Sequence, residues 1–549
     1  MKHTWNWLWQ RIKTRFPAIM VLVASQVSVA VLGVVFALVT RNVIDSAVQQ
    51  NADAFVRDCV IQGAIIAALI LCNVLYRHQH DVLMAELDRD WKKDLLKGLL
   101  RSDYPTVSAF HSGELLNRMN NDVRILNTGF LETLPSVMAL VTRLIAAVVV
   151  LTALEPWFAL VMCLGGLVVI AVTCVVRKRL KKIHIQVSEQ EGRVLGFLQE
   201  VLEKLLMVQA MDAAGEVENR AAGLMEERFQ AQRKRKNVSL VANSCVNLMY
   251  QGASFAALIW CGAKLLHGQM SFGSLTAVIQ LVNQLRAPFT SISAVIPKYV
   301  AMTAAAERLQ ELTELKREDD SIDRPAQELY GQMTAIRAEK LCFSYGRDVL
   351  MENLTLEIPR GAFVAITGPS GIGKSTLLKL LLGIYRPDSG RLYLELAGEL
   401  LEIDRSLRAM FSYVPQGNLL LSGTLRENLL IGKPDAKEEE IKEALYVSAM
   451  DTYLDQLPQG LETVLGENGA GLSEGQAQRL AIARAILGGK PVLLLDECTS
   501  ALDEQTERMV LERIRKLRDR TCIVVTHRSA SVELCDLHLR MQQGSLLTT

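Results

Sequence analysis

A glycine-rich segment in the second half of the chain carries the clearest chemical signal. Residues 368–376 read Gly-Pro-Ser-Gly-Ile-Gly-Lys-Ser-Thr, which fits the spacing G-x-x-x-x-G-K-[ST]. One apolar run precedes this segment and another follows it, as expected for a loop between a buried strand and a helix. Backbone N–H groups in such a loop surround phosphate oxygens, and the helix N-terminus adds positive potential. The residues that we expect to bind the phosphates of a nucleotide are Gly368, Ser370, Gly371, Gly373, Lys374, Ser375 and Thr376.

Two adjacent acids, Asp496 and Glu497, follow the apolar segment 492–495. A buried strand needs no carboxylates at its end, so packing alone does not account for them. Asp496 suits the coordination of Mg²⁺, directly or through water, and Glu497 suits orienting or deprotonating the attacking water in phosphoryl transfer. In the same chemistry Lys374 reaches the β- and γ-phosphates and Ser375 ligates the metal. These residues predict hydrolysis of a nucleoside triphosphate.

Several further motifs, in the same order along the chain, resemble those of the ABC transporter superfamily. The segment 472–476 (Leu-Ser-Glu-Gly-Gln) resembles the signature LSGGQ, and 500–503 (Ser-Ala-Leu-Asp) resembles the D-loop. Residues 414–416 (Val-Pro-Gln) resemble the Q-loop, His527 the switch histidine, and Tyr345 the aromatic residue that stacks on adenine. The resemblance covers nearly the whole chain. It implies that the chain is an ATP hydrolase whose cofactors are ATP and Mg²⁺.

The same resemblance assigns roles to individual residues. It places Gln416 and His527 beside Glu497 as catalytic residues, and it adds Gln416 to the metal ligands Ser375 and Asp496. The residues that it adds to nucleotide binding are Tyr345, Ser473, Gly475 and Gln476.

The family arrangement also implies a partner. Each ATP lies between the phosphate loop of one subunit and the signature of the other, and this chain has one of each. We therefore expect a dimer with a second half-transporter. Only Glu474 and Asn468 deviate from the family pattern, which favours a homodimer and leaves a heterodimer open. An acid such as Glu474 at a helix N-terminus stabilises the helix by about 0.3–1 kcal/mol, but its charge is unfavourable if it points at a γ-phosphate. We expect a hydrolysing site.

The elements that must position these residues fall into two kinds. Residues 17–300 hold long apolar runs, whereas 336–549 read like a soluble α/β domain. We expect a multi-pass α-helical membrane domain with an N-terminal interfacial helix at 1–312, a linker at 313–335, and an α/β P-loop NTPase domain at 336–549. The six predicted transmembrane helices are residues 18–40, 59–76, 134–154, 157–176, 240–266 and 273–302.

Charge in the loops sets the expected orientation. The long loops 77–130 and 177–237 are both charged, and the second begins and ends with runs of Lys and Arg. Basic loops stay in the cytoplasm. Both termini and the ATPase domain are therefore expected on the cytoplasmic side of a plasma membrane. The formal net charge of +1 argues against a nucleic-acid partner.

The membrane half resembles the exporter type of the family. Residues 110–122 and 200–210 look like its first and second cytoplasmic loops, which carry coupling helices, and 465–469 resembles the loop that meets them. The resemblance implies alternating access driven by ATP.

Three functions stay open from the sequence. The first is export of a lipid, a peptide or an amphipathic small molecule. The second is import on the same fold, as in some siderophore systems, and the third is an ATP-gated channel or regulator. The transported substrate is unknown. The polar residues available to a cavity are Gln26, Arg143, Asn243, Asn247, Gln251, Asn283, Gln284 and Arg286, and two inward arginines per chain would favour an anionic or amphipathic cargo.

Overall fold

The chain folds into two compact units. The computed structural model describes residues 2–316, 324–346, 348–417, 420–466, 471–517, 519–542 and 544–548. The first unit comprises Met1–Leu99 and His111–Glu314, and the second comprises Leu100–Phe110 and Leu315–Thr549. The short segment Leu100–Phe110 thus packs with the second unit, although the sequence grouped it with the membrane half. The domain boundaries at 312 and 336 stay a prediction.

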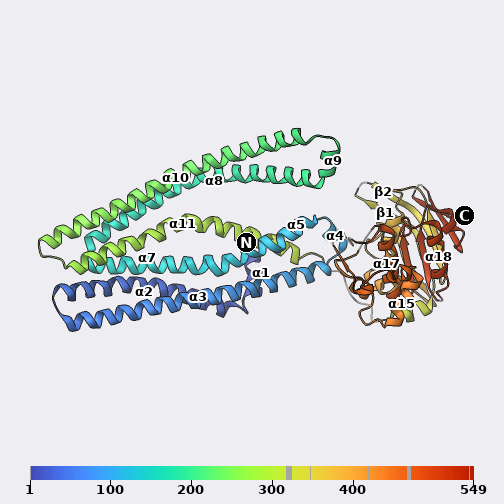
Figure 1. The fold of residues 1–549 in the computed structure, drawn as a ribbon, viewed down its shortest axis with the longest axis horizontal. Coiled ribbons are helices and arrows are strands. Elements are labelled where there is room, and N and C mark those ends of the chain that lie inside the picture. Colours follow the sequence, from blue (N-terminus) through green and yellow to red (C-terminus); the bar gives the residue numbers. More distant parts are fainter. Residues whose placement is uncertain are drawn as a thin grey trace. The chain divides into compact units, whose positions relative to one another are not determined.

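The first unit is entirely helical in its described part (Figure 1). Its long helices are α1 (Lys2–Ile12), α2 (Phe16–Val48), α3 (Ala52–Leu100), α7 (Leu134–Leu154), α8 (Pro156–Glu203), α10 (Ala214–Leu266) and α11 (Phe272–Thr313). Shorter elements connect them: α5 (Ser112–Asn117), η1 (Arg118–Asp122), α6 (Val123–Thr128), η2 (Gly129–Thr133) and α9 (Leu205–Ala210). Helices α8 and α10 pack along each other, and α11 packs against α2, α7 and α10.

Several helices of this unit suit a bilayer. Three helical stretches of the described residues are long and apolar enough to cross a membrane, namely Phe16–Val48, Ala52–Leu100 and Ser112–Leu154. Apolar side chains of α3 such as Val60, Ile70 and Leu71 are mostly exposed, as expected for a surface that faces lipid. Each of the six predicted spans lies within one of the helices α2, α3, α7, α8, α10 and α11, but the count of six spans stays a prediction.

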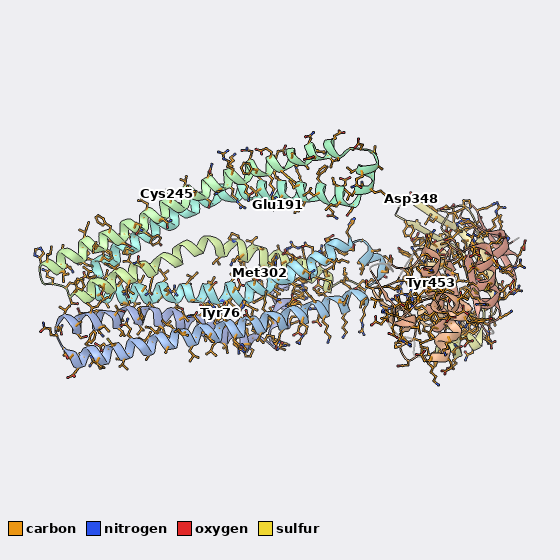
Figure 2. All side chains as sticks on the ribbon, in the orientation of Figure 1. Tyr76, Glu191, Cys245, Met302, Asp348 and Tyr453 are labelled. Carbon is orange, nitrogen blue, oxygen red and sulfur yellow. The ribbon has the colours of Figure 1, made fainter. Side chains whose placement is uncertain are left out.

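Close backbone approaches hold the helices of the first unit together. A Cβ atom added to Gly129 would collide with the side chain of Met302, which is labelled in Figure 2, so α11 packs directly on η2. At the other end of α11, Asp45 of α2 accepts a hydrogen bond from the backbone N–H of Gly273 at 2.8 Å and from the hydroxyl of Ser271 at 2.7 Å. A carboxylate in this place satisfies N–H groups that a helix start leaves unpaired.

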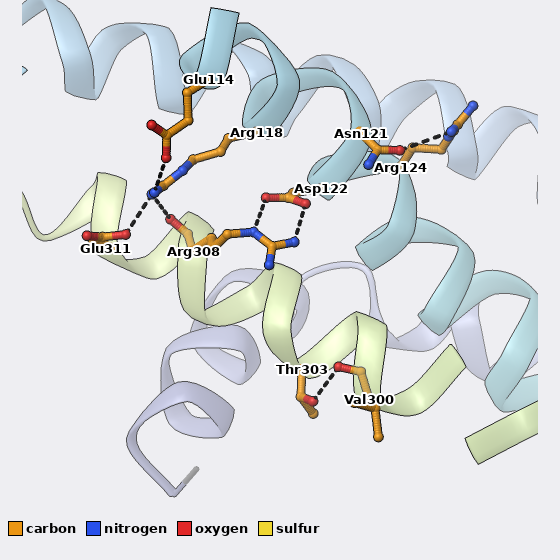
Figure 3. A network of polar contacts seen from close by, with 9 residues as sticks. All are labelled: Glu114, Arg118, Asn121, Asp122, Arg124, Val300, Thr303, Arg308 and Glu311. Atoms are coloured by element: carbon orange, nitrogen blue, oxygen red, sulfur yellow. Dashed lines mark hydrogen bonds and ion pairs between the residues drawn. The ribbon is translucent and has the colours of Figure 1, made fainter. Parts of the chain in front are cut away.

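A network of ion pairs joins η1 to the C-terminal part of α11 (Figure 3). Arg308 donates to both carboxylate oxygens of Asp122, at 2.8 Å and 2.6 Å, and Asp122 is 1% exposed. Arg118 donates to Glu114 and to Glu311, each at 2.6 Å. Because Asp122 is buried, its charge depends on the bidentate contact with Arg308.

The second unit contains two main sheets. One is antiparallel with the order β2-β1-β4-β5, formed by β1 (Met333–Tyr345), β2 (Asp348–Pro359), β4 (Ser389–Leu396) and β5 (Glu399–Glu402). The other has the order β12-β11-β3-β10-β9-β6, formed by β3 (Phe363–Thr367), β6 (Phe411–Val414), β9 (Val492–Asp496), β10 (Thr521–Val525), β11 (Leu537–Gln542) and β12 (Ser545–Thr548). Strands β11, β3, β10, β9 and β6 are parallel to one another, and β12 is antiparallel to β11. A third pair joins β7 (Gly423–Thr424) to β8 (Val464–Leu465).

Helices of the second unit complete the α/β fold that the sequence predicted. They are α4 (Tyr104–Ser108), α12 (Ala326–Gln332), α13 (Lys374–Leu381), α14 (Leu425–Leu430), α15 (Glu438–Val447), α16 (Asp451–Leu454), α17 (Glu474–Leu487), α18 (Glu504–Arg515) and α19 (Ser529–Val532), with short 3₁₀ turns at η3 (Arg405–Met410) and η4 (Gly460–Glu462). Strands β9 and β10 are buried along their whole length, because helices and strands cover both faces of a mostly parallel sheet. This explains the continuous apolar run before Asp496.

Candidate nucleotide-binding and hydrolysis site

The parallel sheet brings the predicted site segments to one edge. Strands β3, β10, β9 and β6 are successive neighbours and run in the same direction. The glycine-rich loop follows β3, His527 follows β10, Glu497 follows β9 and Gln416 follows β6. Carboxyl ends of parallel strands meet at one edge of a sheet, which is where open α/β sheets bind their ligands. Segments far apart in the sequence therefore share one site.

The glycine-rich loop has a conformation that requires glycine. Gly368 has φ 152°, and a Cβ there would lie 2.6 Å from the carbonyl oxygen of Met541. Gly373 has φ 108° and immediately precedes α13. The ammonium of Lys374 donates to the carbonyl oxygens of Gly368 at 2.9 Å and Pro369 at 3.0 Å, and its side chain is nearly buried. Lys374 therefore lies inside the loop that would surround the phosphates.

Other predicted phosphate ligands lie along the same loop and helix. Ser370 and Gly371 are exposed, and Gly371 has φ 80°. Thr376 is buried in the first turn of α13. An exposed hydroxyl and free backbone N–H groups at a helix start are the groups that bind phosphate oxygens.

Glu497 is the centre of the candidate catalytic cluster. Gln416 donates from Nε2 to its Oε2 at 2.8 Å, and Nε2 of His527 lies 2.7 Å from its Oε1. The ammonium of Lys374 lies 3.7 Å from the same Oε1. Glu497 has φ 46°, a left-handed conformation that costs free energy for a residue other than glycine. Its backbone N–H donates to the carbonyl oxygen of Val525 at 3.1 Å, which helps to hold this conformation.

Asp496 lies beside Ser375, as predicted for a metal site. The hydroxyl of Ser375 donates to Oδ1 of Asp496 at 2.9 Å, and the hydroxyl of Tyr413 donates to Oδ2 at 3.0 Å. Burial raises the pKa of the Asp496 carboxyl, and the hydrogen bonds from Ser375 and Tyr413 lower it in part. Carboxylate and hydroxyl oxygens are the ligands that Mg²⁺ prefers, so the residues fit this ion. The sequence did not predict the contact of Tyr413, since a tyrosine in a buried strand is typical of ordinary core packing.

Tyr345 lies in an aromatic cluster at the end of β1. Its ring is 5.0 Å from Phe343 and 5.3 Å from Tyr385, both edge-on, and its side chain remains 40% exposed. Tyr385 is also 6.3 Å from Tyr104 of α4. Burial, and next the hydrogen bond with Tyr345, raise the pKa of Tyr385. Tyr345 thus keeps a free surface for stacking while its neighbours fix its edge. The sequence did not predict that Tyr385 and Tyr104 belong to this aromatic cluster.

The signature residues form the start of α17. Ser473 precedes the helix, its hydroxyl accepts from the N–H of Gln476 at 3.3 Å, and its own N–H donates to Oε1 of Gln476 at 2.8 Å. This is a capping box, which satisfies two N–H groups at the helix start. Glu474 is exposed as the first helical residue. Among the described residues no hydrogen bond or ion pair joins Ser473, Gly475 or Gln476 to the glycine-rich loop.

The D-loop is held from two sides. Gln478 of α17 accepts from the N–H of Ala501 at 3.1 Å and donates to the hydroxyl of Ser500 at 3.2 Å. From the other side, Arg528 donates to the carbonyl oxygens of Leu502 at 2.8 Å and Ser500 at 2.9 Å. The D-loop is therefore hydrogen-bonded to the signature helix α17 through Gln478 and to the residue that directly follows His527, Arg528.

A buried glutamate supports Arg528. Glu507 is 1% exposed and accepts from Arg528 at 2.6 Å, from Thr499 at 2.9 Å and from Ser531 at 2.6 Å. The sequence did not indicate this pair, because α18 holds three glutamates among other polar residues, which is typical of an exposed face.

Some predicted residues lie elsewhere or outside the described part. Residues 467–470, which include Asn468, and the side chains of Asn243 and Arg286 lie outside the described residues. Gln284 donates to the carbonyl oxygen of Gly33 at 2.8 Å, so it joins α11 to α2. Asn283 accepts from Ser254 at 3.4 Å, which joins α11 to α10. In this conformation the side-chain amides of Asn283 and Gln284 form hydrogen bonds between helices.

The geometry first defines the class of protein, an α/β ATP-binding unit of the P-loop type joined to a unit of long apolar helices. Two family models then match the chain: the ABC transporter transmembrane region over residues 19–289, and the ABC transporter model over residues 351–500. The ATP-dependent lipid A-core flippase of Chromobacterium violaceum is 32% identical over 443 residues, which cover 79% of this chain and 74% of that protein. The chain belongs to the ABC transporter family.

Two further comparisons agree with this assignment. The fatty acid ABC transporter ATP-binding/permease protein of Mycobacterium bovis is 28% identical over 439 residues, covering 79% of this chain and 69% of that protein. The solved structure of a bacterial Atm1-family ABC exporter with ATP bound shares the fold with a TM-score of 0.80 at 24% identity, covering 98% of this chain and 95% of that one.

The activity follows from family membership and the architecture. The chain is a multi-pass membrane protein and a half-transporter that binds ATP and couples its hydrolysis to transport. This confirms the predicted fold class and enzymatic activity. One membrane unit and one ATP-binding unit per chain imply dimerisation with another half-transporter.

Proposed function

We propose that this half-transporter exports a lipid-like amphiphile by alternating access, powered by hydrolysis of MgATP. The observation that carries the ATPase part is the cluster of Gln416, His527 and Lys374 around the carboxylate of Glu497. The cargo class rests on the relatives, one described as a lipid A-core flippase and the other as a fatty acid transporter. Export rests on the resemblance of the membrane half to the exporter type of the family.

Each residue of the site has a distinct task in this proposal. Gly368, Ser370, Gly371, Gly373, Lys374 and Thr376 hold the phosphates, and Tyr345 stacks on adenine. Ser375, Asp496 and Gln416 would hold Mg²⁺, and the ion would neutralise charge that develops on the phosphate oxygens. Glu497 accepts a proton from the attacking water or orients it, and His527 donates a hydrogen bond that keeps its carboxylate in place. Ser473, Gly475 and Gln476 complete the site of the partner.

The start of α17 supports the proposal that the signature residues contact a nucleotide bound to the partner subunit. Among the described residues Ser473, Gly475 and Gln476 make no hydrogen bond to their own glycine-rich loop. The N–H groups of Ser473 and Gln476 are used in the capping box, so the helix start would offer a second nucleotide the hydroxyl proton of Ser473 and the positive end of α17. Glu474 is exposed beside them, so its charge would slow phosphate binding there, whereas a glycine would not. We infer a homodimer whose hydrolysis is moderated by Glu474. A chain that is purified alone and is monomeric and inactive, with activity restored by a second gene product, would contradict the homodimer.

The transport cycle requires two global states that ATP favours differently. ATP binding closes two ATP-binding units on each other, the coupling helices move the membrane helices, and hydrolysis resets the cycle. For the chain to work in this direction, the termini and the ATP-binding unit lie in the cytoplasm and the helices cross the plasma membrane.

The cargo class is tested by the ATPase rate of the purified chain in lipid nanodiscs. Fatty acids, lipopolysaccharide fragments, peptides and cationic drugs are added one at a time, with Glu497→Gln as the blank. We expect lipid-like anions to raise the rate, with Arg143→Gln reducing the stimulation and leaving the basal rate unchanged. Stimulation by peptides alone would assign another cargo class.

A further inference from the structure

Each oxygen of the Asp496 carboxylate accepts a hydrogen bond from a hydroxyl group, and the two hydroxyl groups belong to different elements. Ser375 of α13 donates to Oδ1 at 2.9 Å, and Tyr413 of β6 donates to Oδ2 at 3.0 Å. Asp496 itself is 1% exposed, so little water competes for these oxygens. Two directional hydrogen bonds from fixed elements therefore set the orientation of the carboxylate plane.

The two hydroxyls cannot play the same part once a divalent cation is present. Ser375 is the proposed metal ligand, and its oxygen must turn its lone pairs toward the cation. The hydroxyl of Ser375 then keeps its hydrogen bond to Oδ1 only if its proton still points at Asp496. Tyr413 stays on the far oxygen in either case, because it projects from β6, on the side of β9 away from the strand that leads into the glycine-rich loop.

The surroundings keep Tyr413 a donor. An ionised carboxylate only accepts hydrogen bonds, so at 3.0 Å the phenol of Tyr413 is the donor to Oδ2 of Asp496. A group that donates to a ligating carboxylate fixes the direction in which the carboxylate's other lone pairs point, and such outer contacts tune metal affinity strongly.

We propose that Tyr413 is a positioning residue for the divalent cation: it holds Oδ2 of Asp496 so that Oδ1 and the hydroxyl of Ser375 face the same ion. The inference rests on the proposed MgATP site. It goes beyond that site because no motif of the sequence includes Tyr413. It also gives β6 a second task, since the strand that leads into Gln416 would orient a second proposed metal ligand.

The chain offers a matched control in Tyr393. Its phenol also donates to a carboxylate, Oε1 of Glu339 at 2.6 Å, but from β4 of the antiparallel sheet. Tyr413→Phe and Tyr393→Phe remove the same atom and the same kind of hydrogen bond. Only the first removes it from Asp496.

The experiment measures binding of a fluorescent ATP analogue to the full chain in detergent, in a Glu497→Gln background that does not turn over. Each variant is titrated once with EDTA and once with saturating Mg²⁺, and the ratio of the two Kd values gives the gain in affinity due to the metal. For Tyr413→Phe we expect an unchanged Kd in EDTA and a metal gain about tenfold smaller. For Tyr393→Phe we expect the same Kd in EDTA and the same metal gain as in the parent.

Other results contradict the proposal in distinguishable ways. A metal gain equal to the parent's in Tyr413→Phe shows that the phenol does not orient a metal ligand. Equal weakening in EDTA and in Mg²⁺, or a lower unfolding temperature with both affinities lost, shows a structural role and also overturns it. Absence of binding in the parent chain would instead contradict the proposed nucleotide site itself.

Discussion

The Nε2 atom of His527 lies 2.7 Å from Oε1 of Glu497. A carboxylate accepts hydrogen bonds, so the imidazole donates, and Gln416 donates to the other oxygen at 2.8 Å. The three residues follow three neighbouring strands, and Glu497 has the left-handed backbone that turns its side chain toward the other two. The proposed base is therefore held in place by two donors from the neighbouring strands.

Glu497→Gln keeps the shape of the side chain but removes its ability to accept a proton. We expect ATP hydrolysis to fall about 100-fold or more, with ATP affinity within a few-fold of the parent and accumulation of a closed, ATP-bound dimer. Phosphate release and filter binding measure the two quantities. Glu504→Gln changes an exposed acid at the start of α18 and should leave both quantities unchanged. Near-normal turnover in Glu497→Gln would refute the assigned role.

Lys374→Ala removes an ammonium that two loop carbonyls already hold in place. A charge-assisted hydrogen bond contributes about 1.5–3 kcal/mol, so we expect ATP affinity to fall about tenfold or more. Equilibrium binding in EDTA tests this without hydrolysis. Lys442→Ala, on the exposed face of α15, is the control. Wild-type affinity in Lys374→Ala would count against the glycine-rich loop as the phosphate site.

Arg528→Ala leaves the carboxylate of Glu507 buried without its cation. We expect a loss of about 3 kcal/mol in stability and a lower kcat with little change in KM, because the D-loop loses two contacts to Arg528. Lysine has no planar fork, so Arg528→Lys should not restore the rate.

A double-mutant cycle tests the ion pair between Arg528 and Glu507. Glu507→Ala combined with Arg528→Ala should cost less stability than the sum of the single changes, since the double variant buries no unpaired charge. Arg508→Ala, from the exposed Arg508–Glu512 pair on α18, should change stability by at most about 0.5 kcal/mol. Additive losses would show that the pair does not act as a unit.

The network in Figure 3 predicts a similar asymmetry in the helical unit. Arg308→Ala leaves the buried carboxylate of Asp122 without the guanidinium that donates to it twice, and we expect the unfolding temperature in detergent to fall by several degrees. Lys204→Ala removes an exposed ion pair with Glu200 in the same unit and should cost little. Equal effects of the two variants would mean that burial of Asp122 does not matter.

Much of the site could be predicted from the sequence because its motifs encode local geometry. The glycine positions require left-handed backbone, and Ser473 begins α17 with the capping box that its spacing to Gln476 allows. The meeting of Glu497 with Gln416 and His527 was implied only by the resemblance, since the order of strands in a sheet is a long-range property.

Other features leave no local signal. Tyr413 occupies a position in β6 that an ordinary core tyrosine could fill, so only its distance to Asp496 shows its contact. The segment Leu100–Phe110 packs with the ATP-binding unit, yet its composition does not say which unit it contacts. Glu507 reads as a surface acid until the fold buries it against Arg528.

The most direct test of the account is ATP-driven movement of a lipid in sealed proteoliposomes that contain only this chain, with the ATP-binding units facing out. We expect a fluorescent acyl-chain lipid to move from the outer leaflet to the inner leaflet or lumen when MgATP is added outside, and no movement with Glu497→Gln. Full ATP hydrolysis without movement of any amphiphile, accompanied by an ATP-dependent ion flux, would contradict export and favour an ATP-gated channel.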